Sequence, residues 1–301
     1  MMAMHLEDLY RLAIEAGMEA DPRKGAELDM HFKRVREAYE RMGEREKEVF
    51  DLDAMWNPYA DSRIVHGDPR TEVDAVLWGI DINTPELLLA DRLREKGRGI
   101  DAVIGHHPRG RAAASLHQMV TIQENMMEEW GVPITTAECL ERPRAHEVMC
   151  SYHSVNHAQV GDAARLLDIP LMCLHQPADL LAQRFMREYL EAEAPDRLRD
   201  LVDALLALPE YRAAARECNP PEIFAGDRDK RVGAVAVKFA GGDHRAQGHV
   251  RAPVPGGHRH GGVHARAREP RGGGAEAPCQ HRGSEPRGLR LAGDQPAGGQ
   301  V

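Results

Sequence analysis

The stretch AVIGHHP, residues 102–108, decides the fold class. It starts with three apolar residues, which are typical of a short buried strand, and passes directly into two histidines and a proline. A similar apolar run covers residues 75–80, and helical patterns follow both runs, at residues 84–96 and up to Trp130. This alternation of strand, loop and helix predicts an α/β protein with a mostly parallel sheet covered by helices.

The alternation continues toward the C-terminus. The apolar patterns there predict two short strands, at residues 133–135 and 171–174, and two helices, at residues 158–167 and 196–208. These elements extend the same sheet and its covering layers.

The part of the chain before the α/β unit is helical. Apolar spacing predicts a helix that starts at Leu6 and ends at Gly17, since glycine is common just past a helix end. A second, charged helix is predicted over residues 31–47. We therefore divide the chain into an N-terminal helical segment, residues 1–56, and an α/β domain, residues 57–242.

The composition changes abruptly at Gly241. The 61 residues from there onward contain 15 Gly, 9 Arg, 8 Ala and 6 Pro but no Lys, Ile, Met, Phe, Tyr or Trp, so they can bury little apolar surface. Residues 243–301 are a low-complexity tail that is either disordered or translated out of frame. We favour the frameshift, because a one-base shift of a GC-rich gene gives this composition and one permitted reading of the shifted codons contains two helix-and-strand pairs. On either interpretation the C-terminal portion of the domain is lost or disordered.

Charge and composition exclude several classes of protein. The 301 residues include 39 basic and 48 acidic ones, for a net charge of −9, so nucleic acid is not expected as the main partner. An arginine-bearing arm for RNA or acidic partners is a weaker alternative, because the tail lacks lysine and aromatic residues. No run of 18 apolar residues and no signal-peptide pattern occurs, so we expect a cytoplasmic protein with no membrane partner. The five cysteines form no CxxC pair, and no GxSxG nucleophile motif is present.

His106 and His107 are the strongest functional candidates. They directly follow a predicted strand, and ligand sites in α/β proteins lie at the carboxyl ends of strands. Histidine is the commonest nitrogen ligand of metal ions, and Pro108 restricts the backbone of the turn. The alternative is a solvated loop with incidental histidines.

A second histidine cluster, HSVNH at residues 153–157, precedes the predicted helix at 158–167. His153 and His157 could join the first pair in one site. Alternatively, Ser154 or Asn156 caps the helix and the histidines are exposed neighbours.

Polar residues follow two further strands. Asp81 comes after the run at 75–80, where it either acts as a general base or supporting carboxylate, or marks the start of a helix. His175 and Asp179 follow the strand at 171–174, where they line the site or cap the loop, and capping is the commoner role.

These motifs resemble the Nif-three-like family, also described as GTP cyclohydrolase I type two-like proteins. The resemblance covers residues 57–242 and rests on the strand–GHHP–helix unit, the HxxxH motif before a helix, and LDIPLMCLHQPAD at 167–179. It implies an α/β fold, a pair of divalent metal ions in a cleft, and a homo-oligomer in the form of a hexameric toroid.

The resemblance also implies a set of ligands. His106 and His107 match the paired histidines of the family, His153 matches the histidine that opens the second motif, and His157 stands where the family has a bridging Asp. We therefore expect His106, His107 and His157 as metal ligands, with Asp81 or His153 handling the proton. An imidazole in place of the Asp removes negative charge between two dications, which weakens the pair or favours zinc.

The last two ligands of the family, a His and a Glu, have no counterpart in the written chain, although the shifted frame offers both in the segment CMHARENH. The expected function is a metal-dependent hydrolase that uses zinc, iron or manganese and acts on a nucleotide, a phosphoester or a cyclic amide, with the small-molecule substrate unknown. The written chain therefore lacks part of the two-metal site, and loss of activity is one expected consequence. The alternative is a non-catalytic metal-binding or regulatory scaffold that forms the homo-oligomeric toroid.

Overall fold

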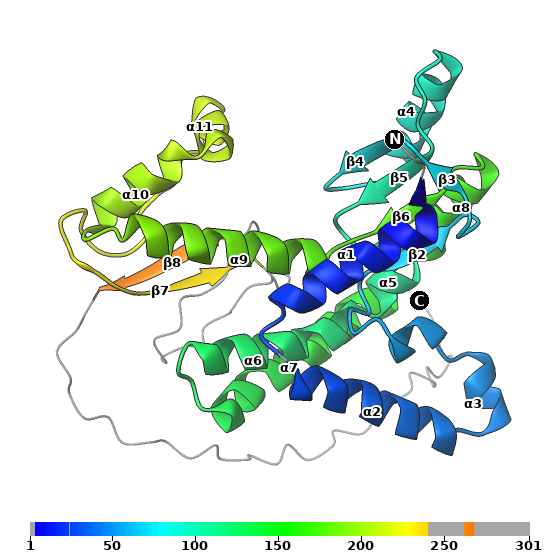
Figure 1. Ribbon diagram of the computed structural model, residues 1–301, viewed down its shortest axis with the longest axis horizontal. Helices are drawn as coiled ribbons and strands as arrows, with labels where there is room; N and C mark the ends of the chain where they lie inside the picture. Colours follow the sequence, from blue (N-terminus) through cyan, green and yellow to red (C-terminus); the bar gives the residue numbers. More distant parts are fainter. Residues whose placement is uncertain (1–3, 24, 240–261, 268–301) are drawn as a thin grey trace, which may run out of the picture. The chain divides into compact units, whose positions relative to one another are not determined.

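The computed structural model describes residues 4–23, 25–239 and 262–267, and the last of these ranges is described by its backbone alone (Figure 1). All of these residues belong to one unit.

The central element is a four-stranded sheet with the strand order β2-β6-β5-β4. Its strands are β2 (Arg63–His66), β4 (Val76–Gly79), β5 (Ala102–Gly105) and β6 (Leu171–Cys173). The strands β4, β5 and β6 run parallel, and β2 pairs antiparallel with β6. The predicted α/β fold with a mostly parallel sheet is confirmed.

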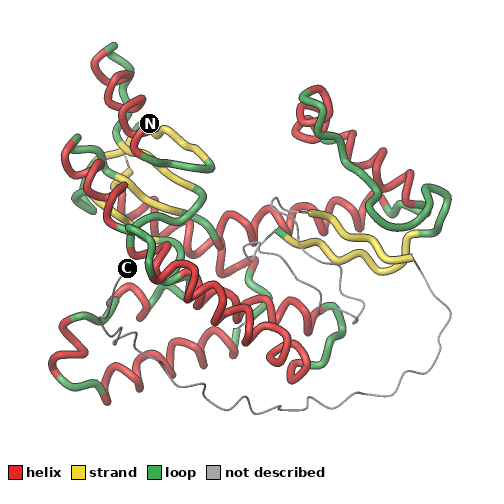
Figure 2. The backbone as a smooth tube through the Cα atoms, turned by 180° about the vertical axis from the view of Figure 1, so that it is seen from behind, coloured by secondary structure: helices red, strands yellow, loops and turns green. Residues whose placement is uncertain are grey.

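Helices occupy the connections between the three parallel strands (Figures 1 and 2). The connection from β4 to β5 is α4 (Thr84–Glu95), as the sequence predicts. The longer connection from β5 to β6 contains α5 (Arg111–Ala114), the 3₁₀ turn η2 (Leu116–Met119), α6 (Val120–Glu129), α7 (Ile134–His153) and α8 (Ala158–Leu166). The single helix expected up to Trp130 is thus divided into three short pieces.

Both faces of the sheet are buried at β5, because this strand has apolar side chains on each side. Ile104 packs in one core with Tyr10 and Met126, and Val103 packs in a second core with Leu87 from α4. This explains why the run at 102–104 is continuously apolar rather than alternating.

Two of the predicted strands differ from the structure. The run at 75–80 was expected to be buried, but among the described strands β4 pairs only with β5, and Trp78 is 50% exposed. The run at 133–135 was expected to be a strand, but Ile134 starts α7, which packs against α6. Three apolar residues do not distinguish a strand from the start of a buried helix.

The N-terminal segment contains α1 (Leu6–Ala20), α2 (Ala26–Arg41), α3 (Glu44–Glu48) and the 3₁₀ turn η1 (Leu52–Met55). The charged helix expected at 31–47 is interrupted, because α2 ends at Arg41 and α3 begins at Glu44. Two short strands, β1 (Met4–His5) and β3 (Glu72–Val73), pair antiparallel. The segment shares its core with the α/β unit through Leu6 and Ile14 of α1, while the boundary at residue 56 stays a prediction.

Gly17 does not end α1, contrary to the sequence prediction, because it serves packing rather than capping. A Cβ atom at this position would lie 2.7 Å from the Cβ atom of Pro177, at the start of α9 (Gln176–Glu193). Glycine therefore allows α1 and α9 to pack closely.

The C-terminal elements form a smaller core of their own. They are α10 (Leu198–Ala207), α11 (Pro209–Arg216) and β7 (Val232–Lys238), and they pack with the second half of α9. The strand β8 (Gly262–Ala267) pairs antiparallel with β7. The rest of the predicted tail, 243–261 and 268–301, lies outside the described residues. Nowhere in the described part of the chain is a helix long and apolar enough to span a bilayer.

Candidate metal centre

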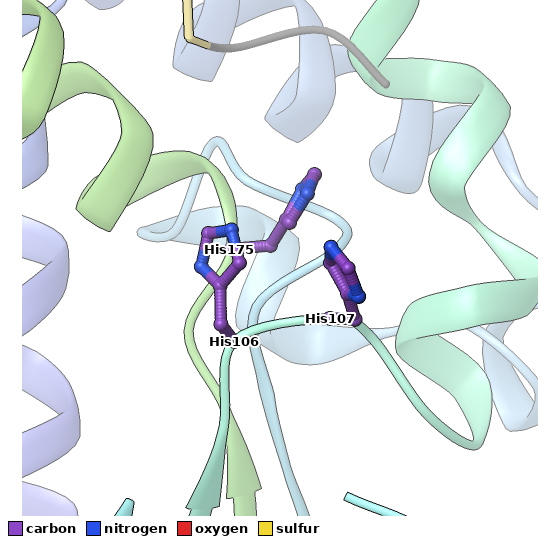
Figure 3. Close-up of side chains that lie close together, drawn as sticks. All are labelled: His106, His107 and His175. Carbon is purple, nitrogen blue, oxygen red and sulfur yellow. The ribbon is translucent and has the colours of Figure 1, made fainter. Parts of the chain in front are cut away.

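The carboxyl ends of β5 and β6 bring three histidines together. His106 and His107 directly follow β5, and His175 lies two residues after the end of β6. Because the two strands are parallel neighbours, their carboxyl ends meet at one edge of the sheet. Figure 3 shows the three imidazoles close together above this edge.

Backbone hydrogen bonds extend the strand pairing into the site. The N–H of His106 donates to the carbonyl of Gly79 (2.8 Å), and the N–H of Leu174 donates to the carbonyl of Gly105 (2.9 Å). The histidines are therefore carried by backbone that belongs to the sheet rather than by a free loop. Such support holds side chains in place for binding.

The side chains of His106, His107 and His175 offer ligand atoms that all lie within 4.8 Å of one another. The ring centroids of His106 and His175 are 4.8 Å apart, and those of His106 and His107 are 5.2 Å apart. Three imidazoles at this spacing can hold a divalent transition metal.

Each of the three imidazoles has an oxygen atom beside its Nδ1 atom. Asp81 Oδ1 lies 2.8 Å from Nδ1 of His107, and Asp61 Oδ2 lies 2.7 Å from Nδ1 of His175. The carbonyl oxygen of Leu174 lies 3.3 Å from Nδ1 of His106. An acceptor at Nδ1 keeps the proton on that atom and leaves Nε2 as the metal ligand, which is the usual arrangement in metalloproteins.

Asp179 adds a carboxylate to the same centre. Its Oδ1 atom lies 3.3 Å from Nε2 of His106, and its Oδ2 atom lies 3.8 Å from Nε2 of His175. Asp179 is in the first turn of α9, four residues after His175, so the helix sets the distance between them. The donor set of three imidazoles and one carboxylate fits zinc or iron.

The electrostatics of the centre also favour a cation. Burial by itself lowers the pKa of His175, but the hydrogen bond with Asp61 and the charges of Asp61 and Asp179 outweigh it and raise this pKa to about 9. The hydrogen bond from His107, followed by the charges of His107 and Arg109, lowers the pKa of Asp81. Without a metal ion, a proton on His175 therefore balances the buried carboxylates.

No protein-family model and no curated protein in the comparisons matches the sequence. Among solved structures, the chain is similar to the crystal structure of a NIF3 superfamily protein from Sphaerobacter thermophilus, with 32% sequence identity and a TM-score of 0.50. The similarity covers 58% of this chain and 62% of that one. The chain is thus similar to a NIF3 superfamily protein. It spans less than two thirds of the length of the solved relative.

The predicted site residues do not all meet in the structure. His106 and His107 lie in the centre, and Asp81 contacts it through His107. His153 is exposed at the end of α7, and His157 precedes α8 with its Nε2 atom 2.7 Å from the carbonyl oxygen of Tyr152. Neither belongs to the histidine group found in the described residues, and their predicted roles stay predictions.

His175 and Asp179 were expected mainly to cap the loop, but they lie in the centre. A signal for them was present, because HQPAD at 175–179 follows a buried strand in the same way that GHHP does. In addition, a His and an Asp four residues apart on a helix lie on the same face. Asp61 had no such signal, since it precedes its strand by two residues and contacts a residue 114 positions away.

Proposed function

We propose that this Nif3-like protein is a metal-dependent hydrolase with a divalent ion held by His106, His107, His175 and Asp179. The observation that carries this proposal is the convergence of three imidazoles that each have an oxygen acceptor at Nδ1. A bound divalent ion would supply a water molecule of lowered pKa as nucleophile. The second ion that the family resemblance implies stays a prediction, as does the hexameric assembly.

The centre has a closed side and an open side. The side chains of His175 and Asp179 are only 8% and 12% exposed, whereas those of His107 and Asp81 are 37% and 60% exposed. We therefore place substrate and water on the side of His107 and Asp81, with the buried pair anchoring the ion.

Asp81 is the group best placed to accept a proton on this open side. Like an ordinary aspartate it is a carboxylate at neutral pH, and the contacts with His107 (2.8 Å) and Arg109 (3.2 Å), which lower its pKa, hold it at the rim. In this proposal Asp81 orients His107 and accepts the proton that hydrolysis releases. His153 remains an alternative proton acceptor.

The experiment is a hydrolysis screen of the purified chain with phosphoesters, nucleotides and cyclic amides, each with zinc, manganese or iron. We expect turnover of one of these classes that falls at least a hundredfold in His106→Ala and persists in His146→Ala, which changes an exposed histidine on α7. Turnover that survives His106→Ala would refute the assigned centre. Metal binding without turnover of any class would instead favour the non-catalytic scaffold.

A further inference from the structure

Asp61 and Ser62 hold His175 at two points. Asp61 Oδ2 lies 2.7 Å from the imidazole Nδ1 atom, and the backbone N–H of His175 donates to Ser62 Oγ (3.0 Å). The two holding residues are themselves connected, because the Ser62 hydroxyl donates to Asp61 Oδ1 (3.1 Å). Side chain and backbone of one histidine are therefore fixed by adjacent residues.

A second set of hydrogen bonds fixes Ser62. Its carbonyl oxygen accepts from the hydroxyl of Tyr10 (2.9 Å), the side-chain amide of Asn57 (2.9 Å) and the guanidinium of Arg63 (2.7 Å). All of these residues are buried, so the network has little freedom to rearrange. It connects α1 and the start of β2 to the metal centre.

The burial of Asp61 is costly and needs a reason. The residue is 0% exposed, and its ion-pair partner among the described residues is the imidazole of His175 rather than a lysine or arginine. A buried carboxylate without a permanent cation lowers stability. The cost is understandable if His175 must be oriented and made more basic for binding.

The three histidines differ in the group that lies beside their Nδ1 atom. His106 has a backbone carbonyl at Nδ1 and His107 has the exposed Asp81, whereas His175 has a fully buried carboxylate. A carboxylate at Nδ1 increases the basicity of an imidazole ligand, and burial strengthens this effect.

We propose that Asp61 is a positioning residue of the metal centre, which keeps His175 in the Nδ1–H tautomer with Nε2 toward the ion, and that Ser62 holds Asp61 in place. This inference rests on the proposed metal centre. It goes beyond that proposal by assigning a residue that does not contact the ion.

The test is the zinc affinity of Asp61→Asn, measured by competition with a chromophoric chelator at pH 7.5. The substitution keeps the size of the side chain and removes its charge, so we expect zinc binding to weaken by about 10- to 100-fold. In addition, two-bond ¹H–¹⁵N correlation spectra of the zinc-loaded protein report the tautomer of His175. We expect the Nδ1–H form in the wild type and a mixture of forms in the variant.

Asp21→Asn is the matched control. Asp21 is also 0% exposed, and its carboxylate bonds Arg23 and Tyr59 rather than a histidine. Asp21→Asn also removes a buried negative charge, so both variants are expected to lose stability. We expect the zinc affinity of Asp21→Asn, however, to stay within about threefold of the wild type.

The outcomes separate this inference from the proposed function. Unchanged zinc affinity and an unchanged His175 tautomer in folded Asp61→Asn would overturn the inference and leave the metal centre standing. If Asp61→Asn does not fold, the zinc affinity of Ser62→Ala is the test. This substitution keeps the charge of Asp61 and removes the hydroxyl that bonds the Asp61 carboxylate. Unchanged zinc affinity of Ser62→Ala would then overturn the inference. A wild-type protein that binds no zinc would refute the proposed function and this inference with it.

Discussion

At the scale of single residues, the centre depends on which nitrogen of each imidazole faces the ion. The acceptors at Nδ1 are a backbone carbonyl for His106, an exposed carboxylate for His107 and a buried carboxylate for His175. Together they leave three Nε2 atoms for a metal ion. The ligand set can therefore be tested one side chain at a time.

His175→Asn and His157→Asn form a matched pair of substitutions for this test. We expect His175→Asn to lose tightly bound zinc, because it removes a ligand from the centre, and His157→Asn to retain it, because His157 bonds the carbonyl of Tyr152 instead. Elemental analysis after dialysis gives the metal content. Zinc loss in His157→Asn together with retention in His175→Asn would contradict this assignment and support His157 as the third ligand.

The pH dependence of metal binding follows from the raised pKa of His175, about 9. Below this pH the imidazole carries a proton that the ion must displace, so the apparent zinc affinity should rise about tenfold per pH unit between pH 7 and 8.5. Calorimetry in buffers with different heats of ionisation should show about one proton released at pH 7.5. Binding that releases no proton would contradict the assignment of His175 as ligand.

The stability of the metal-free protein should fall as the pH rises, whereas the zinc affinity should increase. A histidine whose pKa is raised from 6.5 to about 9 contributes stability that is complete below pH 6.5 and is lost as the pH rises through 9. We expect urea unfolding to show this loss between pH 6.5 and 9. The loss should be absent in His175→Asn, and a loss of equal size in that variant would assign it to another group.

At the scale of elements, the sequence predicts the main features of the fold and the first half of the site. The strand ending in GHHP is recognisable because its apolar run, its histidines and its proline are contiguous. The exposure of β4 is not predictable in the same way, because it depends on which strands lie beside it in the sheet. The contact of Asp61 with His175 joins residues 114 positions apart, which local patterns do not report.

The packing of α1 on α9 gives a prediction at this scale. In Gly17→Ala the new Cβ atom would lie 2.7 Å from Pro177 Cβ and 2.9 Å from its Cα atom, and a proline backbone cannot move aside easily. We expect a loss of about 1–3 kcal/mol in the free energy of unfolding. Gly99→Ala is the control, because nothing lies within 4 Å of a Cβ atom there, and its effect should be below about 1 kcal/mol. Equal effects of the two substitutions would contradict the close packing of α1 and α9.

At the scale of the whole molecule, the change of composition at Gly241 bears on how many metal ions the protein holds. We predict that sequencing the gene across the codons for Phe239 to His244 finds a missing or extra base. A frame-restored chain should then bind about two metal ions, because the shifted frame supplies a further His and Glu, whereas the 301-residue chain should bind about one. An intact reading frame would assign the tail to the native protein, and equal metal content in both chains would show that the shifted residues hold no metal.

The most direct test of the metal centre is anomalous diffraction from a crystal of the zinc-loaded chain. We predict an anomalous peak at the carboxyl ends of β5 and β6, about 2.0–2.1 Å from nitrogen atoms of His106, His107 and His175 and about 2.0–2.2 Å from an oxygen atom of Asp179. A zinc ion bound at His153 and His157, or no peak near the three histidines, would contradict the account.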